Sequence, residues 1–217
     1  MRMEREQNRE RIRQEGIIVI LRARDSEGLA EAVEAILAGG LGVIEVTMNT
    51  PGALETIARV RRQFGDRVLF GAGTVLDPET AREAILAGAD FIVAPVLNPG
   101  MIEVCRSRSK VVIPGCFTPT EILTAWRLGA DFVKVFPAEI GGPAYIRSVL
   151  APLPQVALVP TGGVTVETIG AYFRAGAAAV ALGSSLVSQE ILDRRDFSQL
   201  TERSLRFKEE ADRARHV

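Results

Sequence analysis

Short apolar runs alternate with amphipathic segments along almost the whole chain. The first run, Ile17–Leu21, is continuous and rich in β-branched residues, as expected of a strand buried on both faces. The segment 26–37 then repeats its apolar residues at helical spacing and stops at Gly39-Gly40, and we expect Ser26 to cap it. The same strand-then-helix unit recurs to the end of the chain.

The pattern predicts both kinds of element over the full length. We expect strands at residues 17–21, 43–47, 68–74, 91–94, 111–115, 132–136, 157–161 and 178–182. We expect helices at residues 26–37, 51–64, 78–87, 99–106, 119–128, 143–150 and 165–175, with a leading helix at 1–15 and a last one at 197–215. Five of these helices have a proline in or near the first turn, where its missing N–H costs nothing.

Eight strands that alternate with helices indicate a parallel sheet. Their number and regularity favour an α/β fold closed as a (β/α)8 barrel over an open doubly wound sheet. Because no linker rich in Ser, Pro or Gly interrupts the 217 residues, we expect residues 1–217 to form a single barrel domain with an extra N-terminal helix and a C-terminal helix. The chain contains neither of the glycine-rich motifs GxGxxG and GxxxxGK[ST], so nothing indicates dinucleotide or nucleoside triphosphate binding.

The overall composition narrows the class of partner. A formal net charge of -1 and a pI near 6.0 argue against nucleic acid or an anionic membrane as the main partner. The longest apolar runs are strand-sized, and the N-terminus is charged from Arg2 onward, so we expect no membrane span, no signal peptide and a cytoplasmic location. Cys105 and Cys116 are too few for a secreted disulfide framework.

The only histidine, His216, stands next to the C-terminal residue. At that position it is a poor candidate for a general base or a zinc ligand. Mechanisms of the Ser-His, Cys-His and His-rich metal type are therefore all disfavoured, and we expect no metal and no other cofactor.

Lysine is rare in this chain, since only three of the 26 Lys and Arg residues are lysines. Lys134 lies at the centre of an apolar strand, whereas Lys110 and Lys208 lie in polar surroundings. Burial among Val and Phe should lower the pKa of the Lys134 ammonium and leave free amine that can attack a carbonyl. The alternative is that Lys134 pairs with a buried carboxylate and only fills space.

Residues at the carboxyl ends of the strands are the candidate site of a barrel. Glu45 shares a strand face with Val43 and Thr47, so Glu45 and Lys134 would meet inside the barrel mouth if both face inward. A structural ion pair is the alternative for these two residues.

Other strand ends carry polar or small residues. The Thr74 hydroxyl can donate to a carboxylate or carbonyl, and Pro95 can wall the pocket. Glycine loops after the last two strands, at Gly162-Gly163 and Gly183-Ser184, have the composition of a phosphate site. Glycines at such turns also occur for conformational reasons alone.

Several of these motifs, in order, resemble those of the 2-keto-3-deoxy-6-phosphogluconate (KDPG) and 4-hydroxy-2-oxoglutarate (KHG) aldolases. The resemblance covers about residues 10 to 190. The matching motifs are Glu45-Val46-Thr47, Gly71-Ala72-Gly73-Thr74-Val75-Leu76, Pro114-Gly115, Lys134-Val135-Phe136-Pro137-Ala138, Thr161-Gly162-Gly163-Val164 and Gly183-Ser184.

The resemblance implies a homotrimeric class I aldolase that cleaves KDPG to pyruvate and glyceraldehyde 3-phosphate, and also KHG to pyruvate and glyoxylate. It implies that Lys134 forms the Schiff base and that Glu45 shuttles protons. The substrate-binding residues it implies are Thr74, Pro95, Phe136, Asn49 and Thr161, with Thr74 on the pyruvate carboxylate. Those it implies for the distal phosphate are Arg22, Gly162, Gly163, Gly183 and Ser184.

The sequence departs from this family at Asn49. Many KDPG aldolases have Arg after Glu-Val-Thr-Leu, whereas this chain reads Met48-Asn49-Thr50-Pro51. Neutral Asn cannot make the bidentate charged pair that Arg makes with a carboxylate. The Asn-Thr-Pro form looks more like the branch that acts on the phosphogalactonate epimer.

Two other classes of function share part of this pattern. A phosphate-binding barrel isomerase or epimerase would have the same glycine loops without needing the buried lysine. A non-catalytic sugar-phosphate binding protein would leave Lys134 and Glu45 as an ion pair.

Overall fold

The structure is a computed structural model that describes residues 2–215. The predictions made above for Met1 and His216 therefore lie outside the described residues. The strands are β1 (Ile17–Leu21), β2 (Val43–Thr47), β3 (Leu69–Gly73), β4 (Phe91–Val93), β5 (Val111–Ile113), β6 (Gly115–Cys116), β7 (Val133–Val135), β8 (Leu158–Pro160) and β9 (Val180–Leu182).

Helices connect these strands and flank them at both ends of the chain. The α-helices are α1 (Arg2–Glu15), α2 (Leu29–Ala38), α3 (Ala53–Phe64), α4 (Pro78–Ala87), α5 (Pro99–Ser107), α6 (Pro119–Arg127), α7 (Gly142–Leu150), α8 (Val166–Arg174), α9 (Gln189–Arg194) and α10 (Phe197–Arg215). Two short 3₁₀ helices follow α3 and β7, at Gly65–Arg67 and Ala138–Ile140. Side chains of Asp77, Asn98 and Thr118 cap the helices that begin one residue later at a proline.

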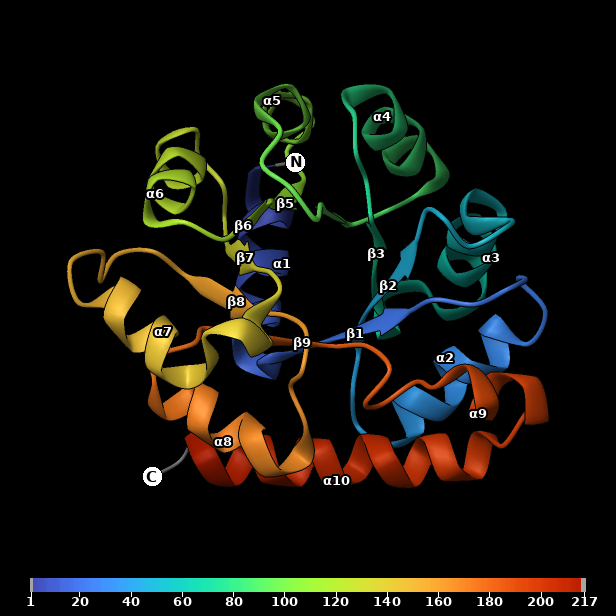
Figure 1. The fold of residues 1–217 in the computed structure, drawn as a ribbon. Coiled ribbons are helices and arrows are strands. Elements are labelled where there is room, and N and C mark those ends of the chain that lie inside the picture. The colour runs from blue at the N-terminus through green and yellow to red at the C-terminus, as the bar shows by residue number, and fades with distance from the viewer. Residues whose placement is uncertain (1, 216–217) are drawn as a thin grey trace.

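The strands are parallel and form a curled sheet in two sections. One section has the order β5-β4-β3-β2-β1-β9 and the other β6-β7-β8. The chain joins them where it runs from β5 through Pro114 into β6, and an isolated bridge pairs Thr161 with Ala181. Figure 1 shows the helices around the outside of the curl, with α10 running across α8 and α2. The predicted α/β fold with parallel strands is confirmed.

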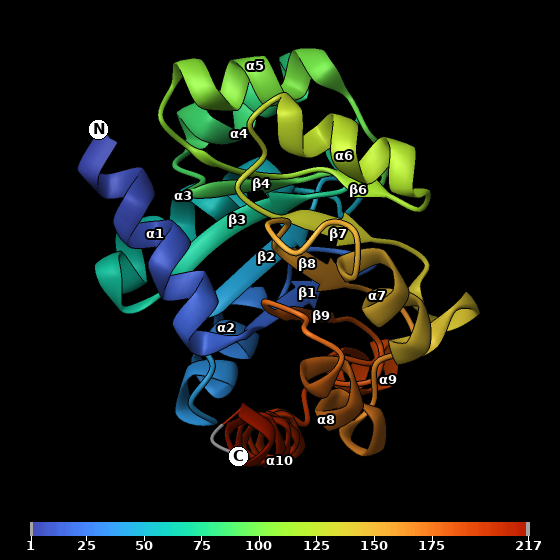
Figure 2. The same cartoon turned by 90° about the vertical axis from the view of Figure 1, so that its left-hand side faces the viewer.

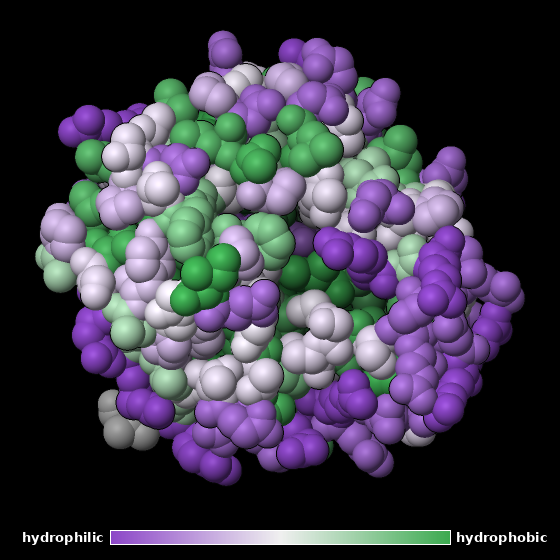
Figure 3. Space-filling model, in the orientation of Figure 1, coloured by the Kyte–Doolittle hydropathy of each residue, from purple (hydrophilic) through white to green (hydrophobic). Residues whose placement is uncertain are grey.

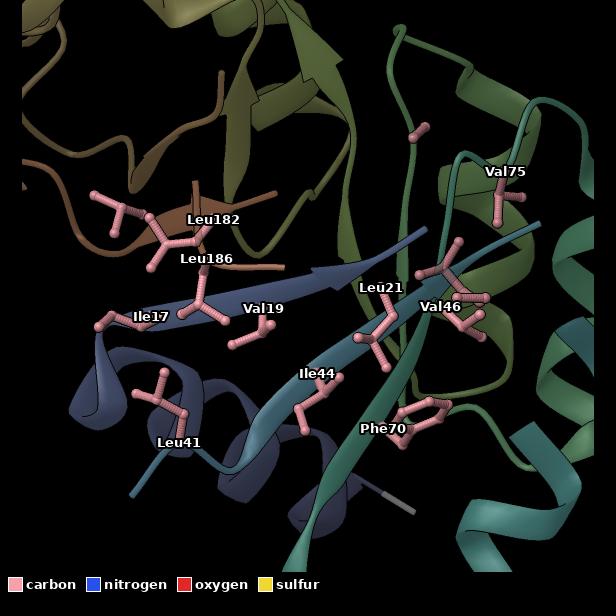
Figure 4. Close-up of a cluster of buried hydrophobic side chains, with 14 of the residues drawn as sticks. Ile17, Val19, Leu21, Leu41, Ile44, Val46, Phe70, Val75, Leu182 and Leu186 are labelled. Atoms are coloured by element: carbon pink, nitrogen blue, oxygen red, sulfur yellow. The ribbon is translucent and has the colours of Figure 1, made fainter. Parts of the chain in front are cut away.

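Successive side chains of each strand point to opposite faces and pack into two separate cores. An outer core lies between the sheet and the helices, and its members around β1 and β2 are drawn in Figure 4. An inner core fills the concave side of the sheet with residues such as Ile18, Val43, Phe91 and Phe132. Because Val43 belongs to this inner core, the face of β2 that also carries Glu45 points inward.

Helix α1 covers the amino-terminal ends of the strands. Its Ile12 joins the inner core, and its Arg5 forms an ion pair of 2.9 Å with the buried Asp131. Figure 1 shows α1 behind the sheet, and Figure 2, turned by 90°, shows it along one edge. The carboxyl ends of the strands are thus the open end of the curl.

Three local predictions were wrong, each for a backbone reason. Ser26 does not cap α2, because Gly28 with φ 75° is its N-cap and makes no side-chain bond. Helix α3 begins at Ala53 and not at Pro51, since Gly52 first turns the chain with φ 72°. Pro114 splits the predicted strand 111–115 because it has no N–H to donate. The remaining predicted bounds differ from the structure by at most two residues.

Among residues 2–215, no helix is both long enough and apolar enough to span a membrane.

Candidate active site

A cavity of about 740 Å³ opens at the carboxyl ends of the strands. Figure 3 shows this face of the molecule hollowed near its centre, with hydrophobic residues inside the hollow. Most of the predicted site residues line the cavity: Arg22, Thr74, Pro95, Lys134, Phe136, Thr161, Gly162, Gly163, Gly183 and Ser184. The fold therefore brings Lys134 of β7 together with residues from the loops that follow β1, β3, β4, β7, β8 and β9.

Lys134 lies at the centre of β7, between two residues that belong to the outer core. Its side chain points inward and is only 7% exposed, with Nζ 5.1 Å from the centre of the Phe136 ring. Burial lowers the pKa of the Lys134 ammonium, and the nearby positive charge of Arg22 lowers it further, whereas the Glu45 carboxylate opposes both. The structure thus agrees with the predicted lowering of the Lys134 pKa.

Glu45 lies at the centre of β2 and is 1% exposed. Burial raises its pKa from 4.5 to about 7, although the charges of Lys134 and Arg22 act in the opposite direction. A Cβ on Gly73 of β3 would overlap Glu45 Oε1, so the glycine makes the space that the carboxylate occupies. Glu45 Oε2 has no hydrogen-bond partner among the described residues. A carboxyl group with a pKa near neutrality can both donate and accept protons.

Glu45 and Lys134 influence each other without a direct ion pair. No contact within the roughly 4 Å of a salt bridge joins them among the described residues, yet each shifts the pKa of the other. Lys134 and Glu45 therefore do not form the direct ion pair that was the alternative to a reactive lysine. Lys134 Nζ lies on the cavity wall without an ion-pair partner among the described residues, and the buried Glu45 carboxyl group lies near enough to shift its pKa.

Thr74 and Pro95 line the cavity where β3 and β4 end. Thr74 has φ 57°, a left-handed conformation that is rare for a β-branched residue and costs of the order of 1–3 kcal/mol. Strain of this kind is concentrated at functional sites. The backbone of Pro95 lies so close to β6 that any Cβ on Gly115 would overlap it, which explains the small residue there.

Two glycine turns form another part of the cavity wall. Gly162 and Gly163 have φ of 96° and 70°, and a Cβ on Gly163 would overlap Glu139. In the second turn, the N–H groups of Leu186 and Val187 both donate to the carbonyl of Gly183. Within residues 2–215, the N–H groups of Gly163 and Ser184 have no acceptor, so they remain available to an anion.

Two predicted residues do not line the cavity. Glu45 is buried behind its wall, and Asn49 is exposed on the turn that follows β2. Sequence reasoning also missed several lining residues, namely Ile20, Glu139, Val164, Thr165, Ala181, Ser185, Val187 and Gln189. Strand alternation could have found Ile20 and Ala181, but Glu139 and Gln189 lie beyond the strand ends, where no periodicity applies.

The other reactive residue types do not compete with Lys134. No group of three or more His, Cys, Asp or Glu residues that could hold a metal occurs in the described part of the chain. Cys105 and Cys116 are buried, and burial raises the pKa of each thiol to about 12, so neither forms a thiolate near neutral pH. The expected independence from metals and cofactors stays a prediction.

A family model and curated relatives place this chain in the same family. The model of the family described as "KDPG and KHG aldolase" matches residues 9–203. A 2-dehydro-3-deoxy-phosphogluconate aldolase of Treponema pallidum is 38% identical, over 88% of this chain and 90% of that protein. A 2-dehydro-3-deoxy-6-phosphogalactonate aldolase of Escherichia coli is 36% identical, over 78% of this chain and 83% of that protein.

Solved structures agree with the sequence matches. A structure described as native KDPGal superposes with a TM-score of 0.86 at 32% identity and covers 93% of this chain and 96% of that one. A KDPG aldolase from Legionella pneumophila, solved with pyruvate captured as a covalent carbinolamine, has a TM-score of 0.79 at 28% identity. The match covers 88% of this chain and 92% of that one.

Proposed function

Because the chain belongs to the KDPG and KHG aldolase family, we propose that it cleaves a 2-keto-3-deoxy-6-phospho sugar acid through a Schiff base on Lys134. With KDPG the products are pyruvate and glyceraldehyde 3-phosphate. The observation that carries the proposal is a buried lysine on the cavity wall, with a lowered pKa and no ion-pair partner among the described residues. The carbinolamine of the Legionella enzyme supports the same kind of covalent step.

The reaction begins when the Lys134 amine adds to the C2 ketone of the substrate. Loss of water from the carbinolamine gives an iminium ion, whose positive nitrogen can accept an electron pair. Removal of the proton from the C4 hydroxyl then breaks the C3–C4 bond, which releases the aldehyde and leaves an enamine. Protonation of the enamine at C3 gives the pyruvate imine, and water hydrolyses it to pyruvate and free Lys134.

Glu45 carries protons in these steps. Its pKa of about 7 means that both its acid and its carboxylate form are present near neutral pH. The acid form can protonate the carbinolamine oxygen as it leaves, and the carboxylate can then take the next proton. Proton transfer by a positioned side chain is worth roughly 10²–10⁴-fold in rate.

Two groups of residues hold the ends of the substrate. Thr74, Pro95, Phe136 and Thr161 line the same cavity as Lys134, and we place the pyruvate portion against them with its carboxylate on the Thr74 hydroxyl. Gly162, Gly163, Gly183 and Ser184, with Arg22, bind the distal phosphate. The N–H groups of Gly163 and Ser184 that lack acceptors support this assignment.

The galactonate epimer is the second candidate substrate. Asn49 stands where many KDPG aldolases have Arg, and the Escherichia coli phosphogalactonate aldolase is similar to this chain at 36% identity. The exposed position of Asn49, outside the cavity lining, favours loose discrimination between the two C4 epimers.

We also propose the finer architecture that the sequence suggested, a single closed (β/α)8 barrel that assembles into a cytoplasmic homotrimer. The bridge between Thr161 and Ala181 and the hydrogen bond of 2.9 Å from Ala178 N–H to the Leu158 carbonyl support closure between β8 and β9.

Covalent trapping tests the assignment of Lys134. Incubation with pyruvate and borohydride should reduce the imine and add one pyruvyl group per chain, which intact mass and peptide mapping locate on the Lys134 peptide. The matched control is Lys110→Ala, which removes a lysine held by an ion pair of 3.3 Å with Glu4 and should leave trapping intact. An adduct that persists in Lys134→Ala would refute the Schiff-base assignment.

A further inference from the structure

The loop after β1 carries Arg22, whose exposed side chain lines the cavity. The charge of Arg22 lowers the pKa of both Lys134 and Glu45, so its guanidinium acts on the interior of the cavity. Arg22 makes no ion pair or hydrogen bond with any other described residue. The position of the Arg22 guanidinium therefore depends on the contacts that hold the neighbouring backbone.

Two anchors of this loop are exposed ion pairs with α9 and its C-terminal end, and a third is the hydrogen bond of 3.1 Å from Arg59 Nη2 to the Ser26 carbonyl. Arg24 lies 3.5 Å from Asp193, with side chains 77% and 50% exposed, and Arg195 pairs with Glu27. Exposed pairs of this kind contribute about 0–1 kcal/mol each. The anchor closest to Arg22 is different, because the N–H of Ala23 donates a hydrogen bond of 3.2 Å to the hydroxyl of Thr50.

Thr50 is itself held firmly in the turn that follows β2. Its side chain is buried, with the residue only 2% exposed, and Thr50 Oγ1 lies 3.1 Å from Oγ1 of the equally buried Thr47. Its backbone N–H donates to the Thr47 carbonyl at 2.8 Å, and its carbonyl accepts from Ala53 N–H at 3.2 Å. A chain of contacts thus runs from β2 through Thr47 and Thr50 to the residue beside Arg22.

We infer that Thr50 is a positioning residue that holds Arg22 in place for the distal phosphate of the substrate. This inference rests on the proposed function, since it states how one end of that substrate is recognised. Thr50 does not line the cavity, so it acts only through the loop. Its hydroxyl gives Ala23 N–H a fixed acceptor and so reduces the number of conformations that the loop can adopt.

Removal of the hydroxyl should change binding of the phosphorylated substrate selectively. In Thr50→Val the Ala23 N–H loses its acceptor, and Arg22 must be ordered anew each time the phosphate binds. Because the phosphate contact is made in the ground state and the transition state alike, KM for KDPG should rise about tenfold with kcat little changed. KM for KHG, which has no phosphate, should stay close to that of the parent.

The test compares kcat and KM for both substrates in the parent, Thr50→Val and Thr50→Ser. Thr50→Ser keeps the hydroxyl and should restore the parent KM for KDPG. Thr56→Val is the matched control, because Thr56 is equally buried but donates to the Gly52 carbonyl within its own helix region. Should Thr50→Val not fold, Thr50→Ala removes the hydroxyl without adding an apolar branch.

The outcomes separate this inference from the proposed function. An equal loss on both substrates, an unchanged KM for KDPG, or a failure of Thr50→Ser to restore it would overturn the role of Thr50. A parent protein that cleaves neither substrate and gives no pyruvate adduct would instead overturn the proposed function.

Discussion

Glu45 is a carboxyl group buried without a hydrogen-bond partner for Oε2 among the described residues. Its burial is costly for folding, and in the proposed mechanism the same burial suits the group to proton transfer. Glu45→Gln keeps the shape and removes the proton carrier, so kcat should fall by roughly 10²-fold or more while the fold is retained. Steady-state kinetics measure kcat, and circular dichroism measures whether the fold is retained. Unchanged activity with a lower melting temperature would make Glu45 a structural residue.

The same variant should show the energetic cost of burying Glu45. Its pKa rises from 4.5 to about 7 on folding, so the folded protein holds a proton that the unfolded chain releases between these pH values. Stability from this group is full below pH 4.5 and is lost as pH rises to about 7, a change of about 3 kcal/mol. The melting temperature of Glu45→Gln relative to that of the parent should therefore be higher at pH 8 than at pH 5. The same difference at both pH values would contradict the raised pKa.

Individual residues differ in how far the sequence revealed them. Lys134 could be predicted because a lysine in an apolar strand is costly, and Glu45 because strand alternation fixes its face. The left-handed backbone of Thr74 could not, since nothing in its neighbours requires φ of 57°. The exposure of Asn49 depends on how the turn after β2 leaves the sheet, which periodicity does not describe.

At the scale of elements, strands and helices followed from hydrophobic spacing, while their ends followed from backbone chemistry. Caps by Asp77, Asn98 and Thr118 agree with the predicted starts, because each precedes a proline. The start of α2 was misplaced because Gly28 can turn in the left-handed region without help from Ser26. Gln189, the first residue of α9, reaches the cavity only through tertiary packing, which a single sequence does not display.

Helix α1 should stabilise the fold without taking part in catalysis. Asp131 accepts from Val112 N–H at 2.9 Å and from Arg5 Nη2 at 3.0 Å, with its side chain 5% exposed. Arg5→Met leaves this buried carboxylate without its cation and should lower the free energy of unfolding by about 2 kcal/mol. Urea denaturation measures the loss, and kcat/KM should be unchanged because α1 lies at the opposite end of the strands.

The matched control for Arg5 is an ion pair on the surface. Arg82 and Glu79 lie 2.9 Å apart with side chains 44% and 74% exposed, so Arg82→Gln should cost about 0.5 kcal/mol or less. Equal losses in both variants would mean that burial of Asp131 does not strengthen its dependence on Arg5.

At the scale of the whole molecule, the proposed homotrimer is open to direct measurement. Large apolar side chains are exposed on the rim of the cavity face, including Leu76 at 54% and Val96 at 51%. The side chain of Asn98 donates to the Leu76 carbonyl at 3.0 Å, so the two loops lie together. Light scattering after gel filtration should give three times the 23.5 kDa of one chain, and a mass of one chain at micromolar concentration would exclude the trimer.

Substrate preference is a property of the assembled cavity, because its lining comes from loops that are far apart in the sequence. We propose that Lys134 and Thr74 hold the pyruvate portion of the substrate, while the turns at Gly163 and Ser184 offer N–H groups to the phosphate. Hydrogen bonds to a charged group contribute about 1.5–3 kcal/mol each, so two of them give roughly 3–6 kcal/mol. At about 1.4 kcal/mol per tenfold, kcat/KM for KDPG should exceed that for KHG by about 10²-fold or more.

A variant with a negative charge at the phosphate end makes this comparison specific. Ser184→Asp places a carboxylate where the phosphate would bind, so repulsion should lower kcat/KM for KDPG far more than for KHG. If Asn49 holds the substrate carboxylate less firmly than Arg would, both substrates are affected alike, because both carry that carboxylate, and their order should not reverse. Steady-state rates on the purified protein measure both effects. If the parent turns over KHG as efficiently as KDPG and Ser184→Asp lowers both rates alike, the glycine loops act only as tight turns and phosphate recognition lies elsewhere.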